Sequence, residues 1–163
     1  MRIIGVDPGL NITGYGVIDV EGDRCVHVHH GVIRTRTTDA IAERLTAIRD
    51  GVRDAAQHWG AVEAAIEASF VGDNARSALA LGQARAAAIL GLAAADLMVA
   101  EYAPAMVKQT VAGYGRGDKE QIARMVRLQL SMSAPPKPAD ASDALAVAIT
   151  HWAHLRLREQ QLL

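Results

Sequence analysis

The chain opens with MRIIGVDPGLNITGYGV, residues 1–17, and this stretch decides how the rest of the sequence is interpreted. Residues 2–6 form a short apolar run that is typical of a strand buried on both faces of a sheet. Asp7 ends the run, and a bend at Pro8 and Gly9 follows directly. A charge beside a hydrophobic core is normally paired or bound to a metal, but Asp also commonly begins turns. From this stretch alone, Asp7 is either a functional carboxylate or the start of a turn.

The composition is that of one ordinary globular domain, residues 1–163, in which 50% of residues are hydrophobic and 21% are charged. A net charge of −1 argues against a protein coated in positive charge for non-specific nucleic-acid binding, but it permits local basic patches. Cys25 is the only cysteine, which excludes an internal disulfide and a cysteine metal cluster. We recognise no signal peptide and no apolar run of membrane-spanning length, so we expect a cytoplasmic protein.

Hydrophobic patterning predicts alternating strands and helices. We expect strands at 11–20 and 24–34, a helix at 41–59, a strand at 61–66, a helix at 74–95, a strand at 97–100, and helices at 105–112, 118–130 and about 140–158. Thr38 or Asp39 is the expected N-cap of the helix at 41–59, and Asp118 that of the helix at 118–130. The helix at 74–95 is rich in small residues and apolar around much of its circumference, so we expect the sheet to cover one side and a second subunit another.

Four acids occupy positions from which they can meet. Asp7 and Glu67 each follow a short apolar strand, and the helix between these strands favours a parallel arrangement with both acids at one edge of the sheet. Asp140 and Asp143 project from one face of the first turn of the last helix, although capping by Asp140 or Ser142 is the simpler explanation for one acid of this turn. Converged carboxylates repel unless cations are present. Oxygen-only ligands favour Mg²⁺ or Mn²⁺, and two such ions can hold a phosphodiester and activate water.

Three histidines lie close together in the strand at 24–34. Strict alternation places His27 and His29 on one face of this strand and His30 on the other. No further ligand with suitable spacing follows them in the sequence. We therefore favour a solvated strand face over a metal site.

The ordered motifs of the chain resemble the RuvC family of bacterial Holliday-junction resolvases. The resemblance covers nearly the whole chain and is carried by residues 4–9, 13–16, 66–67, Phe70, Asn74, 77–79, 81–85, 107–111, 113–119 and 140–146. It implies an α/β ribonuclease H-like fold, with a mixed five-stranded sheet whose first three strands are antiparallel, flanked by helices. It also implies a metal-dependent endonuclease that resolves four-way DNA junctions by paired symmetric nicks, in homologous recombination and DNA repair.

The same resemblance implies a site and partners. Asp7, Glu67, Asp140 and Asp143 match the family's catalytic metal-binding acids, which hold Mg²⁺, or Mn²⁺ in its place, with two ions expected per subunit. The expected partners are four-way junction DNA, a second copy of the chain, and the RuvA and RuvB branch-migration proteins.

Basic and aromatic residues complete the implied site. Lys119 and Lys108 match residues that contact phosphate near the cut, and Lys119 is included among the catalytic residues; ordinary solvated lysines are the alternative. Phe70 matches an aromatic near the junction centre, where it can stack on an unpaired base, with core packing as the alternative. Arg76 and Arg116 are further candidates for DNA contact, although a plain surface position is the simpler interpretation of Arg76, and the loop at 116–118 departs from the family pattern.

Two other functions are compatible with parts of the sequence. A non-catalytic DNA-structure-binding scaffold has the same fold, but it has no need for four intact acids. An actin-like or sugar-kinase ATPase also opens with a strand, an Asp and a glycine turn, but it needs two such lobes, and this chain is long enough for one.

Overall fold

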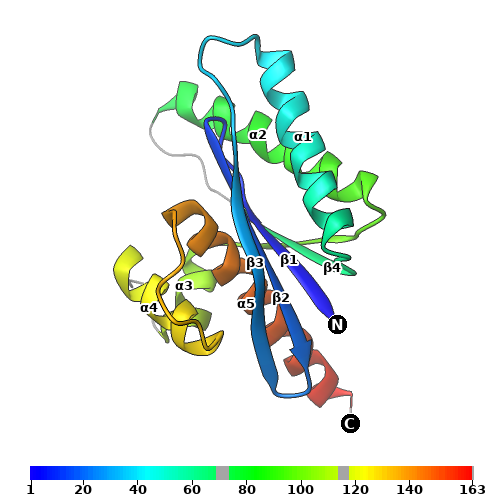
Figure 1. Cartoon of the computed structure of the whole chain (residues 1–163), viewed down its shortest axis with the longest axis vertical. Helices are drawn as coiled ribbons and strands as arrows, with labels where there is room; N and C mark the ends of the chain where they lie inside the picture. The colour runs from blue at the N-terminus through cyan, green and yellow to red at the C-terminus, as the bar shows by residue number, and fades with distance from the viewer. Residues whose placement is uncertain (69–73, 114–117, 163) are drawn as a thin grey trace.

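The computed structural model of the chain describes residues 1–68, 74–113 and 118–162. These residues form a five-stranded sheet of strand order β3-β2-β1-β4-β5, flanked by helices (Figure 1). The elements are β1 (Arg2–Asp7), β2 (Ile12–Glu21), β3 (Arg24–Arg34), α1 (Ile41–His58), β4 (Glu63–Glu67), α2 (Ala75–Ala94), β5 (Val99–Tyr102), α3 (Pro104–Ala112), α4 (Lys119–Gln129) and α5 (Ala139–Gln161). The first three strands are antiparallel, whereas β4 lies parallel to β1 and β5 parallel to β4. The predicted mixed sheet is therefore confirmed.

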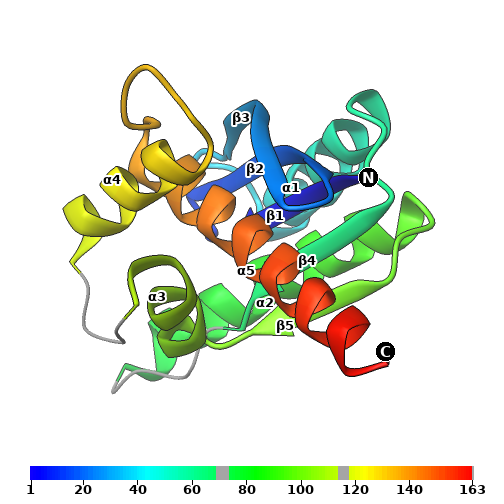
Figure 2. The same ribbon diagram turned by 90° about the horizontal axis from the view of Figure 1, so that it is seen from below.

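Helices cover both faces of the sheet, and β1 is buried between them (Figure 2). Ile4 and Val6 face the layer of α1 and α2, and Ile3 faces the layer that contains α5 together with α3 and α4. All three side chains are fully buried. The apolar run before Asp7 is thus a central strand, and Asp7 stands where this strand leaves the core.

The start of β5 and the capping of α1 differ from the sequence prediction. The last strand is Val99–Tyr102, two residues later than expected, because the chain turns at Asp96 in a left-handed conformation (φ 60°) before Val99 pairs with Ala64. Helix α1 has Ala40 as its N-cap and no side-chain capping bond, so capping by Thr38 or Asp39 was wrong. Capping of α4 is confirmed, since the Asp118 side chain accepts a hydrogen bond from the backbone N–H of Gln121 at 2.8 Å.

Helix α2 is long and apolar enough to differ from the expectation that no run reaches membrane-spanning length. By length and composition alone it is able to cross a membrane, with 20 residues and a mean hydropathy of 1.4 over its best window, which corrects the expectation that no run reaches this length. In the fold, α2 packs against α1 and buries Ala84, Ala88 and Leu92. Leu79 and Leu90 remain 64% and 60% exposed, so an apolar surface is left on its outer side.

Candidate active site

Asp7 and Glu67 end neighbouring parallel strands. Val6 pairs with Ile66, and the two acids follow at the next position of β1 and β4, at the same edge of the sheet. This edge is also where β2 begins, because Gly14 of β2 pairs with Asp7. The structure therefore brings together two carboxylates that are 60 residues apart in the sequence.

Helix α5 lies directly against the sheet because three glycines leave room for its backbone. A Cβ added to Gly14 would lie 2.0 Å from the carbonyl oxygen of Asp140, and one added to Gly5 would lie 2.2 Å from the carbonyl oxygen of Ala144. At Gly16, a Cβ would lie 2.6 Å from the Leu145 side chain. Glycine inside a strand often marks such a close approach of another backbone. The glycine paired with Asp7 thus allows the first turn of α5 to dock beside that carboxylate.

The acids of the first turn of α5 do not cap the helix. The N-cap residue is Pro138, and no side chain makes a capping bond there, so the expected capping by Asp140 or Ser142 was wrong. Ser142 is 2% exposed, and its hydroxyl finds no hydrogen-bond partner within the described residues. Asp140 and Asp143 instead carry their charge near the positive end of the helix dipole, which favours anions.

Burial and like charge raise the pKa values of these acids. Burial raises the pKa of Asp7 to about 8, and the charges of Glu67, Asp143 and Asp140 contribute to the increase. Burial also raises the pKa of Glu67 and of Asp143, with Asp143 acting on Glu67 and Asp140 acting on Asp143. Lys119 opposes the increase at Asp7, Glu67 and Asp143. A shared cluster of like charges that nearby cations relieve is the electrostatic pattern of a functional site.

Asp7, Glu67 and Asp143 line a cleft of about 350 Å³ between the sheet edge, α3, α4 and α5. The Lys119 ammonium lies 3.5 Å from Oδ2 of Asp143, and Lys108 approaches from α3. The lining residues are Asp7, Glu67, Pro104, Val107, Lys108, Asp118, Lys119, Ile122, Asp143 and Ala146. Asp118 lines this cleft as well as capping α4, a place that its capping pattern in the sequence did not indicate.

The remaining predicted residues are placed differently. Asp140 is absent from the cleft lining, although its charge reaches Asp7, Lys119 and Asp143. Arg76 is exposed in the first turn of α2 and does not line the cleft. Phe70 and Arg116 lie outside the described residues.

The donor set of the cleft fits a hard divalent cation. Asp7, Glu67 and Asp143 present only carboxylate oxygens, which are the ligands that Mg²⁺ and Mn²⁺ prefer. Across residues 1–68, 74–113 and 118–162, no group of three or more His, Cys, Asp or Glu side chains is close enough together to hold a metal ion. The acids therefore surround the cleft in a mutually repelling arrangement that a cation would draw together.

The histidines of β3 are arranged differently from strict alternation. A β-bulge lies between the pairs Val17–His29 and Ile18–His27, so Val28 is left unpaired in the ladder. As a result His27 lies beside His30, with Nε2 of His27 2.7 Å from Nδ1 of His30. His29 stacks on Trp59, with ring centroids 4.4 Å apart. The expectation that His27 and His29 share a face was wrong, because the bulge shifts the alternation by one residue.

Comparison with known proteins gives one consistent result. The family model described as crossover junction endodeoxyribonuclease RuvC matches residues 3–151. The RuvC of Rhodopseudomonas palustris (strain TIE-1) is 49% identical over 162 residues, which cover 99% of this chain and 92% of that protein. The RuvC of Burkholderia vietnamiensis (strain G4 / LMG 22486) is 52% identical over 151 residues, covering 93% and 83%. A structure of Thermus thermophilus RuvC in complex with Holliday junction substrate has a TM-score of 0.90 at 32% identity, covering 96% of each chain.

Proposed function

Because this chain belongs to the RuvC family of crossover junction endodeoxyribonucleases, and is a Holliday-junction resolvase, we propose that the cleft at the ends of β1 and β4 is its nuclease active site. The observation that carries the proposal is the meeting of Asp7, Glu67 and Asp143 in one cleft, with the charge of Asp140 close behind them. All four acids are assigned as catalytic metal-binding residues. The whole chain, residues 1–163, acts as one nuclease domain.

The family is one of metal-dependent nucleases. For this chain we assign Mg²⁺ as the ion, with Mn²⁺ able to replace it, and two ions in each subunit. The support is the oxygen-only donor set and the pKa of Asp7 near 8, which a bound cation would lower by favouring the carboxylate. When bound, such ions activate a water for attack on phosphorus and stabilise the leaving oxygen.

The charged residues of the cleft are suited to binding a phosphodiester together with cations. Asp7, Glu67 and Asp143 hold the cations, and their ionised forms are required for this. Lys119 opposes the increase in the pKa of Asp143 and places its own positive charge where a scissile phosphate would enter. Lys108 contributes a second positive charge from α3, and it opposes the increase in pKa at Glu67 and Asp143. Before DNA binds, both lysines thus oppose the increase in the pKa values of the carboxylates. Once DNA is bound, they contact its phosphates.

The junction DNA is proposed to lie over this edge of the sheet. Phe70 is assigned to stacking on an unpaired base by its position in the family motif, and Arg76 and Arg116 are assigned to backbone contacts as nearby basic residues. Exposure of Arg76 on the first turn of α2 is compatible with this role. The Thermus thermophilus relative, 32% identical to this chain, is described in complex with Holliday junction substrate.

A homodimer follows from the need for two cuts. One cleft nicks one strand, so paired symmetric nicks require two clefts related by a two-fold axis. The outer side of α2, with Leu79 and Leu90 exposed, is the surface that we assign to the partner subunit. We also propose a cytoplasmic location and cooperation with RuvA and RuvB, both from family membership.

The direct test is nicking of a synthetic four-way junction. We expect wild-type protein to cut with Mg²⁺ and not with EDTA, and Asp7→Asn to reduce the rate by at least about 100-fold, on the scale of the several kcal/mol that a metal-held oxygen contributes. Junction binding, measured by gel shift in Ca²⁺, should be largely retained. Asp39→Asn, an exposed position outside the cleft, is the matched control. Nicking by Asp7→Asn at the wild-type rate would show that the site is elsewhere, and binding without any nicking by wild-type protein would favour the scaffold function.

A further inference from the structure

The edge strand β3 carries a pair of histidines that the nuclease site does not use. The bulge at Val28 brings His27 onto the face that already holds His30 and Cys25, which is the face covered by α4 and α5. Bulges commonly re-aim a side chain in this way. Because β3 is at the edge of the sheet, this face of the strand is open along its outer side.

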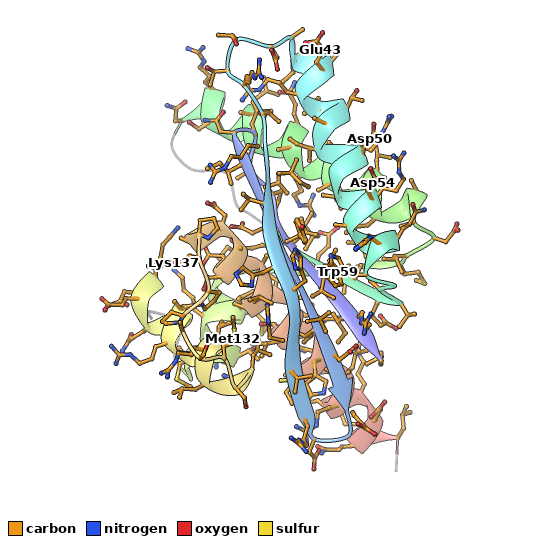
Figure 3. The ribbon with its side chains drawn as sticks, viewed as in Figure 1. Glu43, Asp50, Asp54, Trp59, Met132 and Lys137 are labelled. Atoms are coloured by element: carbon orange, nitrogen blue, oxygen red, sulfur yellow. The ribbon has the colours of Figure 1, made fainter. Side chains whose placement is uncertain are left out.

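The pair lies in a groove of about 710 Å³ between β3 and the connection from α4 to α5. Figure 3 shows Met132 and Lys137 on this connection, which runs alongside β3. The groove is lined by Val26, His27, His30, Leu130, Ser131, Met132, Ser133, Ala134, Pro135, Pro136 and Lys137. It contains no carboxylate among these lining residues, so its chemistry differs from that of the acid cleft.

The two imidazoles converge through their ring nitrogens. Nε2 of His27 and Nδ1 of His30 are 2.7 Å apart, and the rings are inclined at 56° with centroids 4.9 Å apart. The backbone of Lys137 lies beside His30, where it opposes the lowering of the His30 pKa by burial. Of the two facing ring nitrogens, one donates the hydrogen bond and the other accepts it, and the tautomers of the two rings decide which.

Both rings are neutral near pH 7. Burial lowers the pKa of His27 and of His30, and the neighbouring histidines lower that of His27 further. Metal ligation requires neutral imidazole, so no proton has to be removed before an ion binds. Only a tautomer change is needed, in which the donor ring of the pair moves its proton to its other nitrogen and frees the lone pair that faces its neighbour.

We propose that His27 and His30 form a second metal site, distinct from the acid cleft, that takes a late transition-metal ion of the Cu²⁺, Ni²⁺ or Zn²⁺ class. The ion takes the place of the proton now shared between the two nitrogens. Imidazole suits these ions, and affinity is expected to be greatest for Cu²⁺. Mg²⁺ is disfavoured, because the lining supplies no carboxylate oxygens and includes the positive charge of Lys137.

Occupation of this site has a structural consequence. Lys137 of the connection lines the same groove as the two rings, and the connection leads into the first turn of α5, which carries Asp140. An ion held by His27 and His30 stabilises the bulged conformation of β3 that brings the two rings together. Stabilisation by a ligand at 100 times its Kd raises the Tm by about 5–10 °C for a chain of this size.

The test is titration of the whole protein with Ni²⁺ in buffer containing excess Mg²⁺, which occupies the acid cleft. We expect one Ni²⁺ per chain by calorimetry, with affinity reduced roughly 10–100-fold in His27→Gln and in His30→Gln. His29→Gln is the matched control, because it removes a histidine of the same strand whose ring stacks on Trp59 instead of facing the pair. Wild-type Tm should rise with Ni²⁺, and Tm of the two groove variants should not.

Each contrary outcome overturns the proposal. Absence of Ni²⁺ uptake by wild-type protein means that the two rings only hydrogen-bond each other. Uptake that survives both groove variants but is lost in Asp143→Asn places the ion in the acid cleft. If a variant fails to fold, ¹⁵N ring shifts of wild-type protein during Zn²⁺ titration decide the matter: Nε2 of His27 and Nδ1 of His30 must move, and movement confined to His29, His58 or His154 refutes the site.

Discussion

Replacing Asp7 by asparagine should stabilise the fold while it abolishes cleavage. The side chain is half-buried beside Glu67 and Asp143, and its pKa is raised from 3.8 to about 8. Asparagine has nearly the same shape and no charge to bury. Removal of this proposed catalytic residue therefore relieves the repulsion between the acids of the cleft in the absence of cations.

The size of this effect follows from the pKa of Asp7. A shift from 3.8 to about 8, at about 1.4 kcal/mol per unit, corresponds to about 6 kcal/mol once Asp7 is fully ionised and to about 4 kcal/mol at pH 7. Water entry and small movements of the acids reduce such penalties in proteins. We expect Asp7→Asn to raise the free energy of unfolding by about 2–4 kcal/mol at pH 7 without divalent cations.

The pH dependence has a definite sign. Between pH 3.8 and about 8 the folded state holds the Asp7 proton more tightly than the unfolded state does, so wild-type stability decreases as the pH rises through this window. Asp7→Asn does not lose stability in this way. The difference in the free energy of unfolding between variant and wild type should therefore grow from pH 5 to pH 8 and then level off. Saturating Mg²⁺ should shrink the difference, because it binds and stabilises the wild-type cleft preferentially.

Urea unfolding in EDTA at pH 5, 7 and 8.5, followed by circular dichroism, measures these differences. Asp39→Asn, which removes an exposed carboxylate, should leave stability within about 0.5 kcal/mol of wild type. The reasoning is refuted if Asp7→Asn is less stable than wild type at pH 8.5, or if the difference does not change with pH. Either result would mean that Asp7 does not share a buried cleft with other acids.

Three further outcomes are expected. Gly14→Ala should lose about 1–3 kcal/mol of stability and most nicking activity, because a Cβ there would lie 2.0 Å from the Asp140 carbonyl oxygen. The control Gly82→Ala has open space around the added Cβ and should gain about 0.5–1 kcal/mol in the same urea assay. Equal stability of the two variants would contradict the close approach of α5 to Gly14. Lys119→Met should move the pH–rate profile of nicking to higher pH, because this lysine lowers the pKa values of the acids. The control Lys137→Met should leave the profile unshifted. An unshifted profile for Lys119→Met would show that Lys119 does not act on the acids. EDTA should stop nicking without unfolding the chain, and Mg²⁺ or Mn²⁺ should restore it; cleavage in EDTA would exclude a metal-dependent site.

Much of the fold was predictable because it depends on short-range patterns. The apolar run before Asp7 is a central strand because it has no polar position to expose, and both of its faces are covered in the structure. The N-cap at Asp118 also depends on contacts three residues away. The four acids stood out because each follows a strand or begins a helix. In all these cases the deciding interactions lie within one element or its immediate end.

Other features were decided by contacts between distant segments. The bulge that pairs His27 with His30 arises from the register of β3 against β2, which alternation within β3 does not reveal. The start of β5 at Val99 depends on its pairing with Ala64. Expected caps at Asp39 and Asp140 do not form, although aspartate favours the N-cap position, because the backbone enters these helices differently.

The sequence by itself determined the residue types of the proposed active site, the strands and helices that carry them, and the family to which the chain belongs. Only the tertiary structure decided that Asp7, Glu67 and Asp143 line one cleft, and that Asp140 lies outside the lining but near enough for its charge to act on Asp7. The physical reason is that this meeting depends on the docking of α5 onto Gly5, Gly14 and Gly16. A glycine pattern permits a close approach, but the packing of the whole core determines which backbone makes it.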